Sequence, residues 1–93
     1  MEFEWDRKKA KYNLRKHGVS FEEASTVFED VLADVYEDPD HSSEEKRFLM
    51  IGTSNRGRLL YVAFADRAQR IRIISARIPT RREKKFYEEE KQQ

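Results

Sequence analysis

Residues 47–76 read RFLMIGTSNRGRLLYVAFADRAQRIRIISA, and their pattern predicts the central sheet of the domain. It contains three runs rich in β-branched, aromatic and other apolar residues, which predict strands at 47–54, 59–65 and 70–76. The first two runs are joined by Asn-Arg-Gly at 55–57, which is typical of a hairpin turn, and the last two by four residues. Connections this short predict that the three strands are antiparallel neighbours in one sheet.

Alternation of side chains along these strands sorts them into two faces of the sheet. Leu60, Val62 and Phe64 share one face, which we expect to be the core side, and Ile71 and Ile73 play the same part in the last strand. The opposite face, or the strand ends beside it, carries aromatic and basic side chains: Tyr61, Arg72, Arg58 and Arg77.

The N-terminal residues predict a short strand followed by two helices. Residues 2–5 alternate as a strand does, and Asp6 can cap a helix that runs to about residue 17 and ends at Gly18. We expect the inner side of that helix to be formed by Ala10, Leu14 and His17. A second helix is indicated by a capping box and by apolar residues at helical spacing: Ser20, Glu23, Phe21, Ala24, Phe28, Val31 and Leu32.

The rest of the chain completes an α+β pattern. Residues 33–37 predict a short edge strand, and Thr80 with Glu83 predicts the start of a C-terminal helix that runs to about Glu90. The order is therefore β-α-α-β-β-β-β-α in a single domain over residues 1–93. We expect an antiparallel sheet with the two N-terminal helices packed on one face and the other face partly open.

Composition excludes several classes of protein. The chain has no cysteine, so a disulfide scaffold, a thiolate nucleophile and a cysteine zinc site are ruled out. No apolar run approaches the length of a membrane-spanning helix, and MEFEWDRKK lacks the apolar segment of a secretory signal. We therefore expect a cytoplasmic protein with no membrane partner.

Charge is strongly segregated along the chain, although the net charge is only +1. Residues 21–45 carry ten acidic side chains and no lysine or arginine, whereas residues 46–87 carry twelve basic side chains and two acidic ones. Two interpretations follow. The basic block can form a face for a polyanion, or the two blocks can neutralise each other through surface ion pairs.

The histidines and the acidic loop allow more than one interpretation. His17 can act as a general acid or base, or can simply cap the end of its helix, and His41 lies in a loop beside two serines. The acidic side chains Asp38, Asp40, Glu44 and Glu45 lack the spacing of a calcium loop, so a solvated loop is favoured over a metal site. We expect no metal and no cofactor.

Three stretches together resemble one known family: FEWDRKKAKYNLRKHGVSFEEASTVFED, HSSEEKRFLMIGTSNRGRLLYVAFADR and IRIISARIPTRREKKFYEE. They are similar to the BrnT toxins, the toxic half of a bacterial type II toxin–antitoxin pair, and KHGVSFEEA and IRIISAR are the most specific segments. The resemblance implies a RelE-like fold and a ribonuclease that arrests translation. It also implies neutralisation by a BrnA-type antitoxin, through which the complex binds operator DNA and represses its operon.

RNA cleavage needs a base for the 2′-hydroxyl proton, cations for the developing charge on phosphorus and an acid for the leaving oxygen, but no metal. We therefore expect a metal-independent endoribonuclease in which Arg58, Arg72 and Arg77 clamp phosphate and Tyr61 positions or stacks a base. For the base and the acid, the candidates are His17, Glu45 and a lysine of the first helix.

Further residues are expected to bind the two partners. Contacts to RNA are expected from Lys8, Lys11, Arg47 and Arg81, and contacts to the antitoxin from Phe86 and Tyr87.

Two alternatives belong to different functional classes. A relative that has lost activity can persist as a binding module, acting only as antitoxin partner and co-repressor. A direct nucleic-acid-binding protein is also compatible with the charge blocks, although the sequence shows no helix-turn-helix pattern.

Overall fold

The helices and strands of the computed structural model follow the predicted order, and the structure describes residues 1–41 and 45–92. The elements are β1 (Glu2–Glu4), α1 (Arg7–His17), α2 (Phe21–Ser25), a 3-10 turn (Thr26–Glu29), β2 (Asp34–Glu37), a 3-10 turn (Pro39–His41), β3 (Arg47–Thr53), β4 (Leu59–Arg67), β5 (Arg70–Arg77) and α3 (Arg81–Lys91). In the described part of the chain, no helix has both the length and the apolar character needed to cross a bilayer. The predicted α+β class is confirmed.

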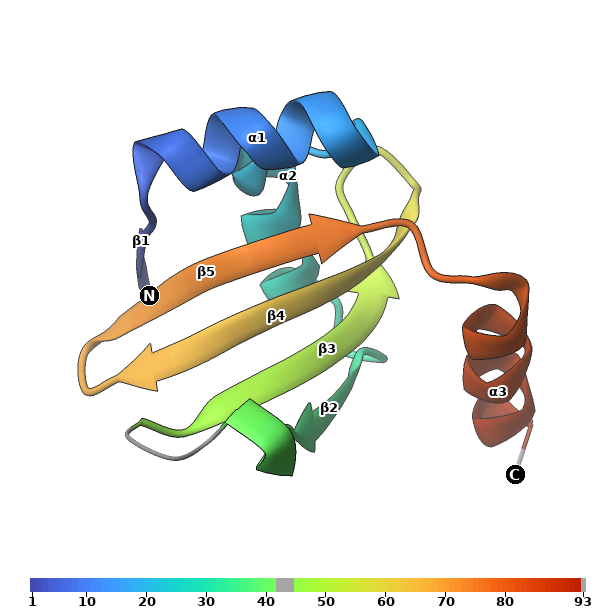
Figure 1. Ribbon diagram of the computed structural model, residues 1–93. Coiled ribbons are helices and arrows are strands. Elements are labelled where there is room, and N and C mark those ends of the chain that lie inside the picture. The colour runs from blue at the N-terminus through green and yellow to red at the C-terminus, as the bar shows by residue number, and fades with distance from the viewer. Residues whose placement is uncertain (42–44, 93) are drawn as a thin grey trace.

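The five strands form one sheet in the order β1-β5-β4-β3-β2, with α1 and α2 on one side of it (Figure 1). Every neighbouring pair is antiparallel except β1 and β5, which run parallel with Phe3 opposite Ile71. The sheet is therefore mixed, whereas we expected it to be antiparallel throughout. No hairpin links β1 to β5, because the two helices and three strands lie between them, so no short turn sets their relative direction.

The hydrophobic core lies between the sheet and the two N-terminal helices. Leu60 and Val62 of β4 are fully buried there, and Phe64 lies beside them, as the alternation predicted. Phe64 meets Phe28 edge to face, with ring centroids 4.8 Å apart. Apolar residues before and within α2 seal the same core, namely Val19, Phe21 and Ala24.

The inner side of α1 differs from the predicted one. Asn13 is only 4% exposed, whereas Leu14, which we expected to face the core, is 51% exposed. The helix turns Ala10 and Asn13 inward, a spacing of three residues. A polar residue is accommodated at this position because its amide is fully occupied by hydrogen bonds to Val19 and Ala76.

The second helix ends earlier than predicted. Regular α-helix stops at Ser25, and Val31, which we expected on its inner face, is 95% exposed. The cause lies in Asp30, whose carboxylate accepts hydrogen bonds from the backbone N–H of Leu32 at 2.9 Å and of Thr53 at 2.8 Å. These bonds draw the chain against the end of β3 and replace further helical turns.

A β-bulge interrupts the pairing of β4 with β5. Ala63 is opposite Ser75 and Phe64 is opposite Ile73, so Ile74 is the extra residue. Strict alternation would place Arg72 and Arg77 on opposite faces because five positions separate them. The bulge brings both arginines to the face of the sheet that α1 and α2 do not cover.

Candidate functional site: a hollow on the open face of the sheet

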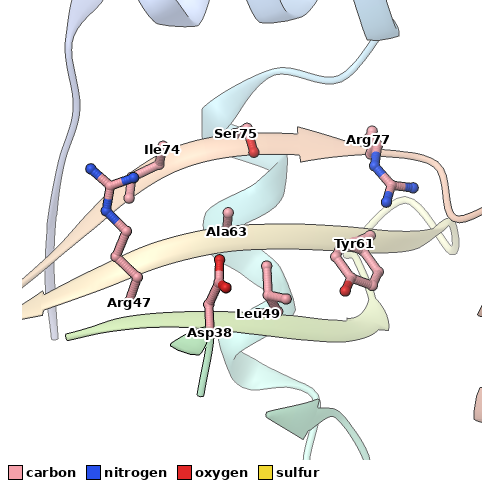
Figure 2. A pocket seen from close by; sticks show the side chains of 8 residues that line it. All are labelled: Asp38, Arg47, Leu49, Tyr61, Ala63, Ile74, Ser75 and Arg77. Atoms are coloured by element: carbon pink, nitrogen blue, oxygen red, sulfur yellow. The ribbon is translucent and has the colours of Figure 1, made fainter. Parts of the chain in front are cut away.

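A hollow lies in the middle of the open face, where β4 and β5 carry the small side chains Ala63 and Ser75. Leu49 of β3, Ala63 of β4 and Ser75 of β5 lie side by side in the pairing register and form its floor. Larger side chains stand around them, and the volume of the hollow, which is open to solvent, is about 300 Å³. Figure 2 shows this hollow with Arg47 towards one end and the pair Tyr61 and Arg77 towards the other.

Tyr61 and Arg77 form one wall as a stacked pair. They are direct partners in the register of β4 and β5, and the guanidinium carbon of Arg77 lies 4.5 Å from the centre of the Tyr61 ring. Burial raises the pKa of the Tyr61 phenol, and the nearby Glu83 carboxylate raises it further. The phenol is therefore protonated at neutral pH and can donate a hydrogen bond into the hollow.

Glu83, in the first turn of α3, holds the guanidinium of Arg77. Nη1 and Nη2 of Arg77 donate to Oε1 and Oε2 of Glu83 at 2.7 and 2.8 Å. This pair lowers the pKa of Glu83 from 4.5 to about 2 and raises that of Arg77. Arg77 thus stays charged and fixed in place.

Asp38 and Arg47 supply a carboxylate and a second cation to the hollow. The two residues lie where β2 and β3 begin to diverge, and the backbone N–H of Asp38 donates to the carbonyl of Arg47 at 2.8 Å. One carboxylate oxygen of Asp38 accepts the N–H of Asp40 at 3.2 Å, which orients the side chain. In Figure 2 the Asp38 carboxylate reaches over the floor beside Ala63 and Leu49.

A second, more apolar hollow adjoins the first at Tyr61, between the open face and α3. Its volume is about 290 Å³, and Ile51, Phe86 and Tyr87 provide most of its apolar lining. Phe86 is 54% exposed, and the hydroxyl of Tyr87 donates to the carbonyl of Leu32 at 3.4 Å. The two aromatics predicted to bind an antitoxin, Phe86 and Tyr87, therefore lie beside the first hollow, which we call the polar hollow.

Arg58, predicted to clamp phosphate, lies elsewhere. Its Nε donates to Oε2 of Glu23 at 2.9 Å, its Nη2 pairs with Oε1 of Glu23, and Nη2 also reaches the carbonyl of Gly18 at 3.1 Å. Glu23 is only 5% exposed, accepts a further bond from Ser54, and has a pKa lowered chiefly by Arg58. In this structure Arg58 joins the start of β4 to α2, and it is not among the residues that line the polar hollow.

Arg72 lies on the open face but outside the polar hollow. It shares a row with Arg47, since both pair with Ala65 of β4, and its Nη1 donates to Glu4 of β1 at 3.0 Å. All three arginines predicted to clamp phosphate are thus bonded to carboxylates. Only Arg58 among them pairs with the acidic block, through Glu23. Arg56 and Arg67 also pair with that block, so mutual neutralisation of the two blocks describes part of the basic block.

The remaining predicted RNA contacts and proton donors do not gather at the polar hollow, except for Arg47. His17, Lys8 and Lys11 belong to α1, across β5 from the floor, and Arg81 is exposed at the start of α3. Glu45 pairs with Arg67 at 3.0 Å and lies 4.0 Å from Arg47.

The acidic loop is described only in part, because Glu44 lies outside the described residues. In the ranges 1–41 and 45–92, no three acidic or histidine side chains cluster closely enough to hold a metal.

Sequence reasoning missed three participants in the hollow and its walls: Asp38 as part of the site, Ser75 and Glu83. The sequence places Asp38 in an acidic loop and predicts Glu83 only as part of a helix cap. Both have a sequence signal in retrospect. Asp38 follows an edge strand opposite Arg47, and Glu83 follows a strand-ending arginine by six residues.

The fold and the hollow define a small α+β protein whose open sheet face carries two arginines, a tyrosine and a carboxylate around one hollow. The model of one family, described as the ribonuclease toxin BrnT of type II toxin–antitoxin systems, matches residues 5–83. The chain belongs to this BrnT family. Membership implies an antitoxin protein as partner and RNA as target.

A solved crystal structure shares the fold. The crystal structure of the Brucella abortus ribonuclease toxin BrnT matches with a TM-score of 0.66 and 24% sequence identity, covering 87% of this chain and 99% of that one. The likeness confirms the architecture. No curated protein matched the chain.

Proposed function

We propose that the chain cleaves RNA in the polar hollow, without a metal, and thereby arrests translation in the cytoplasm. The observation that carries this proposal is the position of Arg47 and Arg77 around the floor of the hollow, with Asp38 and Tyr61 at the same hollow. Two cations match the charge of a phosphodiester as it becomes a dianionic phosphorane. A carboxylate and a phenol provide a proton acceptor and a proton donor.

The reaction needs no nucleophile from the protein. The 2′-oxygen of the RNA bonds to the adjacent phosphorus as its proton passes to the Asp38 carboxylate. The bond from phosphorus to the 5′-oxygen breaks, and the Tyr61 hydroxyl donates a proton to that oxygen. The products are a 2′,3′-cyclic phosphate and a 5′-hydroxyl.

The test is cleavage of a defined RNA by purified protein in excess EDTA, with Arg77→Ala beside Arg70→Ala. Arg70 provides a matched control because it lies on the same strand, carries the same charge and does not line the hollow. We expect Arg77→Ala to lower kcat/KM by about a hundredfold or more, and Arg70→Ala to change it by less than about threefold. Equal losses of kcat/KM in the two variants would indicate that both arginines act only by attracting RNA through their positive charge.

A parent protein that binds the antitoxin but leaves RNA intact, with and without ribosomes, would support the non-catalytic binding module instead. Because Arg58, Arg72 and Arg77 are already paired with carboxylates, this alternative should be tested directly.

We further propose that the partner is a BrnA-type antitoxin. In that proposal the complex reaches operator DNA through the antitoxin, so the isolated chain should not bind operator DNA specifically.

A further inference from the structure

The wall of the polar hollow is fixed from outside the sheet by the first turn of α3. Glu83 accepts hydrogen bonds from both terminal nitrogens of Arg77. Its Oε1 also accepts a hydrogen bond from the backbone N–H of Thr80 at 2.8 Å. Thr80 in turn accepts the N–H of Glu83 at 3.1 Å, which completes a capping box. The carboxylate that grips Arg77 is therefore held by the start of the helix itself.

We propose that Glu83 is a positioning residue, which presents one particular edge of Arg77 to the RNA phosphate; this inference rests on the proposed function. A guanidinium has five N–H groups arranged around a plane. The Glu83 carboxylate accepts one N–H from each of the two terminal nitrogens of Arg77. The backbone carbonyl of Ile78 accepts the second N–H of Nη1 at 3.3 Å. These bonds leave Nε–H and one Nη2–H, which lie parallel on the side edge of the group.

That remaining edge suits a phosphate. Two parallel N–H groups match two oxygens of a phosphodiester, so an arginine clamped end-on by a carboxylate can still bind phosphate side-on with full geometry. The Tyr61 ring, 4.5 Å from the guanidinium carbon, fixes the plane of the group as well. Arg77 is thereby ordered before RNA arrives, which removes an entropic cost from the reaction.

The far end of α3 is attached separately, and this provides a control. Nζ of Lys91 donates to Oδ1 of Asp34 at 2.7 Å, and Tyr87 contacts Leu32. Loss of the Lys91 contact loosens the docking of α3 without removing any bond to Arg77. A purely structural role for α3 and a specific role for Glu83 therefore predict different results.

The first arm of the test measures RNA cleavage by the full chain and by Glu83→Gln, Lys91→Ala, Arg77→Ala and the double variant Glu83→Gln/Arg77→Ala. We expect Glu83→Gln to lower kcat by about ten- to a hundredfold with a smaller change in KM, because Arg77 meets most charge in the transition state. Lys91→Ala should stay within about twofold of the parent, and Glu83→Gln should have no further effect once Arg77 is absent. Equal losses for Glu83→Gln and Lys91→Ala, or full activity of Glu83→Gln, would overturn the proposal.

The second arm does not depend on cleavage, and so separates this inference from the proposed function. A 2′-O-methyl oligonucleotide cannot be cut by the 2′-hydroxyl route and serves as the probe. In the parent protein, the Nε–H resonance of Arg77 should shift on adding the oligonucleotide, and in Glu83→Gln this shift should be at least halved. If the parent fails to cleave RNA but shows this difference, the proposed function fails and the positioning role stands. Equal shifts in both proteins overturn the positioning role.

Discussion

The side-chain amide of Asn13 hydrogen-bonds both backbone groups of Ala76. Nδ2 of Asn13 donates to the Ala76 carbonyl at 2.7 Å, and the Ala76 N–H donates to Oδ1 at 3.1 Å. β1 pairs with β5 only as far as Arg72, so α1 lies beside this later part of β5. The amide takes the place that a neighbouring strand would have, and it fixes α1 to the strand that ends in Arg77.

Replacing Asn13 should therefore destabilise the fold well beyond the loss of one surface contact. We expect Asn13→Ala to lower the free energy of unfolding by about 2–4 kcal/mol, because it leaves buried backbone groups of Ala76 and Val19 without partners. Urea unfolding followed by circular dichroism measures the change. The control is Leu14→Ala on the exposed side of α1, which should cost less than about 1 kcal/mol. Equal costs would contradict this account.

Gly52 of β3 permits the close approach of the loop that precedes β2. A Cβ atom there would lie 2.7 Å from Cβ of Ala33 and 2.9 Å from Cγ1 of Val27. We expect Gly52→Ala to cost about 1–3 kcal/mol of unfolding free energy through overpacking. Ala33→Gly introduced on the Gly52→Ala background should recover part of the loss. An additive double variant would show that the clash with Ala33 is not the cause.

Lowering the pH should decrease the free energy of unfolding, because it protonates two carboxylates that are bound to arginines, Glu23 and Glu83. Both have a pKa lowered in the folded state, that of Glu83 to about 2 against the usual 4.5. A lowered folded pKa stabilises the protein above the unfolded value, and this contribution disappears as pH falls from about 4.5 towards 2. We expect Glu83→Gln to remove about 1–2 kcal/mol of the pH-dependent stability, after allowance for solvent around this partly exposed pair. Urea midpoints at pH 7, 4 and 3 for parent and variant test this, and parallel curves would refute it.

The aromatics of α3 should contribute to antitoxin binding. Phe86 is largely exposed beside the apolar hollow, and Tyr87 lines the same hollow. We expect Phe86→Ala combined with Tyr87→Ala to raise the Kd for the antitoxin at least tenfold, measured by calorimetry. Tyr12→Ala replaces an exposed aromatic on α1 and should leave the Kd within about twofold. An unchanged affinity of the double variant would place the antitoxin on another surface.

The order of elements and the core side of β4 could be predicted from the sequence, because short turns and period-two alternation are local properties. Leu60, Val62 and Phe64 needed no information from elsewhere in the chain. The burial of Asn13 could not be predicted in this way. Its partner Ala76 is 63 residues away, and only the assembled fold shows that a polar side chain is satisfied there.

The candidate site was predicted only in part. Tyr61, Arg77 and Arg47 come together as the sheet forms, but the bulge at Ile74, which brings Arg77 to this face, breaks the alternation on which prediction rests. Arg58 looked equivalent to Arg77 in the sequence because both are arginines at strand ends. A buried carboxylate, Glu23, makes Arg58 a link between elements, and no local pattern distinguishes the two cases.

The extra residue in β5 also affects how this strand tolerates changes in length. Deleting Ile74 would leave Ile73 and Ala76 pointing to the core and Arg72 and Arg77 pointing outward, since a regular strand then joins the two halves in phase. A deletion at any other interior position of the strand would put the two halves out of phase unless the bulge moved with it. Related chains can therefore differ by one residue at this point and still present the same side chains, and an alignment gap there need not signal a lost site.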